Sequence, residues 1–124
     1  MHHHVMRISS KYLDFIENGK KTYLGRPLYY KGEEMWKKTH KGDTITFQGD
    51  NKSVDVMITQ VFCHPSDLGD VLGFFLKGKY KEDLPDVISR EDARKKYISD
   101  YGEETLSHGI IEIHWKLINK INWD

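Results

Sequence analysis

The sequence predicts an α+β fold: a small, mostly antiparallel β-barrel of five to six strands with about four inserted helices. Two short alternating segments, 43–48 and 54–58, flank a turn and are typical of a β-hairpin. Helical segments stand between strands, but without the regular strand–helix alternation of a parallel sheet. The apolar pattern also shifts its parity between Ile58 and Val61, which fits a β-bulge of the kind that curves a small barrel.

The first elements are a strand at 5–8 and a helix with an apolar stripe. Ser9 and Ser10 offer side-chain oxygens to cap this helix, and Gly19 supplies the residue at which its left-handed end is expected. A strand over 21–28 follows, because Thr and Tyr favour extended backbone.

The later elements include three stronger periodic signals. Residues 66–78 carry apolar positions at helical spacing, and the segment from Ser89 to Gly102 begins with a capping box and predicts a second helix. Residues 29–38 form a short helix at best. The last strand, at 110–118, has apolar residues on both faces, so we expect it near the centre of the sheet.

Composition places the chain among single-domain globular proteins spanning 1–124. Hydrophobic residues make up 38% and charged residues 31% of its 124 residues. It contains no apolar run of membrane-spanning length, no signal-peptide pattern and one cysteine, Cys63, so we expect a cytoplasmic monomer that contacts no membrane. His2 to His4 are either native or the remnant of a purification tag.

The stretch of greatest interest is GKKTYLGR, from Gly19 to Arg26. It places two lysines and an arginine where a helix gives way to a strand. A lysine supplies a point charge and an arginine a planar fork, and both suit a phosphate or a base edge. The sequence therefore predicts an anion-binding site here, although exposed residues that pair with nearby acids would give the same pattern.

This stretch resembles the ASCH domain family of the PUA-like superfamily. The resemblance rests on Gly19, Lys21 and Arg26, followed by Trp36 and the segment KGDTITF at 41–47. It covers about residues 4–118. It implies a PUA-like barrel that holds RNA, a nucleoside or a nucleotide in a basic cleft.

Leu24 departs from the family's pattern. The family usually has a glutamate at this position, and its small cytidine amidohydrolases have a nucleophilic threonine there. Leucine can supply neither function. The resemblance therefore favours binding over catalysis for this chain.

The predicted ligand-binding residues combine cations with neighbouring aromatic groups, a combination suited to single-stranded nucleic acid. They are Lys20, Lys21, Thr22, Tyr23, Arg26, Tyr30 and Trp36. No cofactor is expected. No metal is expected either, because the histidines lack metal-ligand spacing.

Two other functions stay open. The first is a small hydrolase, either an N4-acylcytidine amidohydrolase or a ribonuclease, in which Lys21 would be the catalytic base that activates water or Thr22. The second is an adaptor domain that binds other proteins and keeps the basic motif only as a relic.

Overall fold

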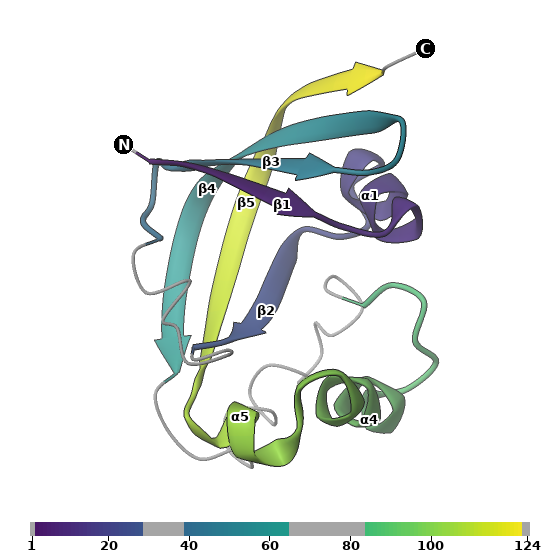
Figure 1. Cartoon of the computed structure of the whole chain (residues 1–124), viewed down its shortest axis with the longest axis vertical. Coiled ribbons are helices and arrows are strands. Elements are labelled where there is room, and N and C mark those ends of the chain that lie inside the picture. The colour runs from purple at the N-terminus through teal and green to yellow at the C-terminus, as the bar shows by residue number, and fades with distance from the viewer. Residues whose placement is uncertain (1, 29–38, 65–83, 123–124) are drawn as a thin grey trace.

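A computed structural model describes residues 2–28, 39–64 and 84–122 of the chain (Figure 1). Within these ranges the elements are β1 (His3–Arg7), α1 (Ser10–Glu17), β2 (Tyr23–Pro27), β3 (Thr44–Gln48), β4 (Lys52–His64), α4 (Arg90–Tyr101), α5 (Glu103–Ser107) and β5 (Ile110–Asn122).

The strands form one curled sheet in the order β1-β3-β4-β5-β2, so β1 and β2 are its two edges. β1 runs parallel to β3, and the other neighbouring strands are antiparallel. Figure 1 shows β4 and β5 as long strands through the middle, with α1 toward one end of the molecule and α4 and α5 toward the other. This half-barrel confirms the predicted fold class.

The bulge predicted from the apolar parity is present in β4. The register between β4 and β5 shifts between Ile58 and Gln60, and a second shift lies between Asp55 and Val56. Each shift leaves extra backbone on one strand and increases the local twist. The two long strands therefore coil, and the sheet curls into half a barrel.

The predicted helix caps are also present. The Ser9 hydroxyl accepts a hydrogen bond from the backbone of Tyr12, and the Ser89 hydroxyl accepts one from Asp92. Gly19, with a φ of 82°, follows α1 as expected. Among the described helices, none is both long and apolar enough to cross a membrane. The helix predicted at 66–78 and the segment 29–38 lie outside the described residues.

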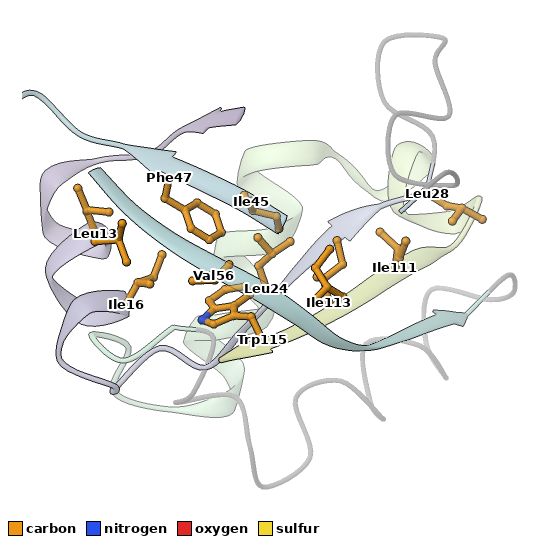
Figure 2. Packing of buried hydrophobic residues seen from close by; sticks show 12 residues of the cluster. Leu13, Ile16, Leu24, Leu28, Ile45, Phe47, Val56, Ile111, Ile113 and Trp115 are labelled. Carbon is orange, nitrogen blue, oxygen red and sulfur yellow. The ribbon is translucent and has the colours of Figure 1, made fainter. Parts of the chain in front are cut away.

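The main core lies between the concave side of the sheet and α1. Figure 2 shows Leu13 and Ile16 of α1 pointing toward Phe47 and Trp115 of the sheet. The rings of Phe47 and Trp115 lie 5.1 Å apart, centroid to centroid. A second cluster joins α4 and α5 to the sheet through Tyr23, Leu84, Ala93, Tyr97, Leu106 and Ile110.

The expected burial of β5 on both faces is right only for its first half. Residues 110–113 are all buried, whereas Leu117 is 48% and Ile118 50% exposed. The cause is the short partner strand, because β2 pairs with β5 only from Ile110 to His114. Beyond that point β5 has β4 as its neighbour on one side alone.

Phe47→Ala should lower the free energy of unfolding by about 3–5 kcal/mol, because it empties the centre of the main core. Phe47 is fully buried. Urea unfolding followed by tryptophan fluorescence measures the change. Phe62→Ala is the control, since Phe62 is 44% exposed and its loss should cost much less. Equal losses in the two variants would contradict this account of the core.

Asp43 ties the start of β1 to the turn before β3. Its carboxylate accepts hydrogen bonds from the backbone N–H groups of His2, at 3.0 Å, and His40, at 3.1 Å, and contacts the His4 ring at 3.2 Å. Burial alone would raise the pKa of Asp43, but these hydrogen bonds outweigh it and hold the pKa well below the ordinary value of 3.8.

Because the folded-state pKa is depressed, Asp43 stabilises the fold fully above the unfolded-state pKa. This stabilisation begins to be lost as the pH falls below about 4 and is gone only below the much lower folded-state pKa. Asp43→Asn should therefore cost about 1–3 kcal/mol at pH 7 and measurably less at pH 3. Denaturant titrations at both pH values measure this, with the exposed Asp50→Asn as control. A cost that is the same at both pH values would refute the stabilising role of the ionised Asp43 carboxylate.

Candidate functional site

A cavity of about 240 Å³ opens between β2, α4 and the junction of β1 with α1. Its described lining residues are Arg7, Ile8, Ser9, Tyr12, Lys21, Leu24, Gly25, Arg26, Leu84, Lys96, Tyr97, Asp100 and Tyr101. Three separate parts of the chain thus meet around it. The motif predicted from the sequence contributes one wall.

The turn between α1 and β2 fixes where this wall begins. Gly19 adopts a left-handed φ of 82°, and the backbone N–H of Lys21 then donates to the carbonyl of Phe15 at 2.9 Å. The chain turns sharply back along α1. The Lys21 side chain is therefore buried, whereas Lys20 is exposed.

The Lys21 ammonium is held inside the cavity wall. Lys21 is only 5% exposed, and its Nζ donates to the carbonyl oxygen of Tyr23 at 3.1 Å. It also lies 5.6 Å from the centre of the Tyr12 ring, and Lys96 Nζ lies 5.7 Å from the same ring. A backbone carbonyl and an aromatic face are thus among the contacts of this buried ammonium group.

Tyr12 is positioned by a carboxylate outside the cavity lining. Its hydroxyl donates to Asp86 at 2.9 Å, and Lys11 pairs with the same carboxylate at 2.6 Å. Burial would raise the pKa of Asp86, but the contacts with Lys11 and Tyr12 prevail and lower it. The Asp86 carboxylate thus pairs with Lys11 and accepts a hydrogen bond from Tyr12.

Arg26 lies where the two edges of the half-barrel approach each other. Its Nη1 donates to the Tyr101 hydroxyl of α4, and its Nη2 reaches the Met6 sulfur of β1 at 3.7 Å. Its Nε is buried and has no hydrogen-bond partner among the described residues. A thioether is a weak acceptor, so the guanidinium has donor capacity that these contacts do not satisfy.

The backbone of Gly25 also lines the cavity. In the pairing of β2 with β5, the Thr22 carbonyl accepts from Trp115 at 3.4 Å and the Leu28 N–H donates to Gly109 at 2.9 Å. Backbone groups alternate direction along an antiparallel strand. The N–H and C=O of Gly25 therefore point away from β5, toward the outer edge of β2.

The charges around the cavity are strongly unequal. Among its described lining residues, Arg7, Lys21, Arg26 and Lys96 are cationic and Asp100 is the carboxylate, a net formal charge of +3. Asp100 pairs with Lys96 at 3.3 Å on the surface of α4. Lys21 is buried and Arg26 is half-buried, whereas Arg7 is exposed.

Two of the predicted site residues, Lys21 and Arg26, line this cavity together. Lys20 and Thr22 do not line it. Tyr23 does not either: it is 1% exposed, and its ring stacks on His114 with 4.7 Å between ring centroids. The other two, Tyr30 and Trp36, lie outside the described residues.

Most lining residues were not predicted as site residues from the sequence, among them Arg7, Tyr12, Lys96, Tyr97 and Tyr101. The contribution of α4 could have been recognised in part, because Tyr97 and Tyr101 stand four residues apart on this helix and so share one of its faces. The sequence could not say which strand that face would meet.

A second group of titratable residues lies where β4 meets β5. The Glu112 carboxylate contacts Nε2 of His64, at 3.2 Å, and Nε2 of His114. Burial would raise the pKa of Glu112, but the two imidazoles more than offset that effect and lower it. Across the described residues, no cluster of histidine, cysteine and acidic side chains has the geometry to hold a metal ion.

Solved structures resemble the whole described fold. The chain superposes on a hypothetical protein, PH0355, with a TM-score of 0.75 and 26% sequence identity, covering 94% of this chain and 99% of that one. Protein PF0455 from Pyrococcus furiosus gives a TM-score of 0.72 at 23% identity, covering 94% and 98%.

A third similar structure is ASCH from Zymomonas mobilis, with a TM-score of 0.58 and 15% identity, covering 95% of this chain and 71% of that one. At that identity the likeness concerns the fold. No protein-family model matches the sequence, and no curated protein matches it.

Proposed function

We propose that this chain, which has an ASCH-type fold, binds RNA or a nucleoside-like ligand in the cavity between β2 and α4. Lys21 and Arg26 hold the phosphate or a base edge of the ligand. The tyrosines of α4 provide an aromatic wall beside them, and the backbone edge of β2 forms the opposite side.

The observation that carries this proposal is the unused donor of Arg26 beside a second cation. Arg26 donates to a hydroxyl and a thioether, and its buried Nε has no partner in the described chain. The buried Lys21 lines the same cavity. An anionic ligand would accept from the Nε of Arg26 and make strong, charge-assisted hydrogen bonds there.

Aromatic side chains favour a nucleic-acid component over a simple anion. Tyr97 and Tyr101 both line the cavity, and their rings lie 6.3 Å apart at an angle of 32°. A base that packs against such a wall gains about 1–3 kcal/mol. Tyr12 is less suited to this role, because two ammonium groups already lie near its ring.

Short single-stranded RNA should bind in the micromolar range or more weakly, since a few ion pairs must offset the ordering of the strand. Its affinity should fall with salt by about 0.7 log units per log unit for each contacted phosphate. The double variant Lys21→Ala, Arg26→Ala should weaken binding and flatten this slope by about one unit. Fluorescence anisotropy with a labelled oligomer at several salt concentrations measures both quantities.

Lys20→Ala is the matched control, because it removes a neighbouring positive charge that does not line the cavity. It should leave the slope nearly unchanged. If the double variant binds RNA as the wild type does, with the same slope, the cavity is not the ligand site. That result would favour the adaptor function.

A second candidate, a small hydrolase, is favoured by the burial of Lys21, since a desolvated lysine can act as a base. Two observations oppose it. The side chain at position 24 is a leucine that belongs to the main core, and Thr22 does not line the cavity.

Purified protein should therefore not remove the acetyl group from N4-acetylcytidine at a measurable rate, because no nucleophile stands at position 24. Chromatographic separation of acetylcytidine from cytidine after long incubation tests this. Turnover that disappears in Lys21→Ala and persists in Lys20→Ala would establish the hydrolase in place of the binding module.

A further inference from the structure

We infer that the cavity selects uracil among the RNA bases, because one of its walls offers two donors and one acceptor in the order that matches the uracil edge. This inference rests on the proposed function and names the base that the cavity reads. Three features support it: the outward backbone groups of Gly25, the donor of Arg26 that follows them, and the composition and size of the lining.

The first feature is the backbone of Gly25, which offers one donor and one acceptor. In the ladder with β5, the Thr22 carbonyl accepts from Trp115 and the Leu28 N–H donates to Gly109. Because successive residues direct these groups to alternate sides, those of Gly25 are not used in the ladder. β2 is an edge strand of the sheet, and Gly25 lines the cavity. Its N–H and C=O therefore suit a ligand that carries an acceptor beside a donor.

The second feature is a donor on the carbonyl side of this pair. Arg26 follows Gly25 in the strand, so its side chain leaves the backbone next to the Gly25 carbonyl. Its Nη1 and Nη2 contact Tyr101 and Met6, whereas its Nε has no partner among the described residues. Along β2 the groups thus follow in the order donor, acceptor, donor.

This order matches the Watson–Crick edge of uracil, and proteins commonly read that edge of a base on single-stranded RNA. Uracil presents a carbonyl, an N–H and a second carbonyl in sequence. Its O4 accepts from the Gly25 N–H, its N3–H donates to the Gly25 carbonyl, and its O2 accepts from Arg26. Cytosine has a donor in place of O4 and an acceptor in place of N3–H, so it opposes both groups of Gly25.

The third feature is a lining that is rich in donors and small. Cytosine, adenine and guanine each carry an exocyclic amine, which donates. The four cationic side chains of the described lining also donate and accept nothing, and its carboxylate, Asp100, pairs with Lys96. Acceptors for an amine are therefore scarce. The volume of about 240 Å³ lies below the range of about 300–1,000 Å³ typical of drug-sized ligand pockets, and it favours a single-ring base.

The experiment compares the 5′-ribonucleotides of the four RNA bases, which share the ribose phosphate and differ only in the base. Calorimetric titrations at neutral pH give the dissociation constants. Uridine 5′-monophosphate should bind about ten-fold more tightly than each of the others, a discrimination that well-placed hydrogen bonds to a base edge can supply. 3-Methyluridine 5′-monophosphate lacks the N3–H and should lose most of this advantage. That comparison uses the unaltered protein, so it does not depend on the folding of a variant.

Gly25→Pro and Gly25→Ala are a matched pair of variants. Proline removes the outward N–H without breaking a ladder hydrogen bond, and β2 already contains Pro27 at another outward position. Alanine adds a side chain and keeps the N–H. The preference for uridine should fall several-fold in Gly25→Pro and persist in Gly25→Ala, with circular dichroism to verify that each variant is folded.

Arg26→Lys tests the third contact. It keeps a positive charge in the cavity wall but removes the Nε donor. It should lower the preference for uridine several-fold and lower the affinity for the nucleotides as a group much less. Lys20→Ala should leave the preference unchanged, because Lys20 does not line the cavity.

The other outcomes are equally decisive. If the nucleotides of all bases bind equally and the double variant Lys21→Ala, Arg26→Ala binds none of them, the proposed function stands and the uracil inference is wrong. A preference for another base, or a preference for uridine that survives methylation at N3, would also overturn it. Inorganic phosphate that binds as tightly as uridine 5′-monophosphate would show that the base is not read. Failure of every nucleotide and RNA oligomer to bind would overturn the inference together with the proposed function.

Discussion

The antiparallel pairing of β4 with β5 is the interaction on which the other elements depend. β4 carries β3, and through it β1, on one side, while β5 carries β2 on the other. The two register shifts coil this pair of strands, so that β1 and β2 curl toward each other. Arg26 can reach Met6 only because of this curl, although the strands that carry them stand at opposite edges of the sheet.

Local sequence patterns predicted most of the described fold. The serine caps, the left-handed Gly19 and the bulge after Ile58 each depend on a few neighbouring residues, and each is present. The resemblance to the ASCH family is confirmed at the level of the fold. The extent of burial in β5 was harder to predict, because it depends on the length of β2, a strand far away in the sequence.

The site was predictable only in part for the same reason. A short motif placed Lys21 and Arg26 in one stretch, and both line the cavity. The motif could not reveal that Tyr101 of α4 would complete the wall, because that contact depends on how α4 packs across the sheet. Nor could it show that Tyr23 turns toward His114 and away from the cavity, since alternation along a strand does not say which face meets solvent.

The position of β2 at the edge of the sheet has a consequence for the order of folding. β2 has β5 as its strand neighbour, and Tyr23 pairs with His114 near the other end of the chain. The hairpin of β3 with β4 closes a short loop and can form early, whereas contacts distant in sequence form slowly. During synthesis, β2 is made long before its partner. The cavity beside β2 is therefore expected to be among the last parts of the molecule to assemble, because a nascent chain that lacks β5 leaves β2 without its strand partner.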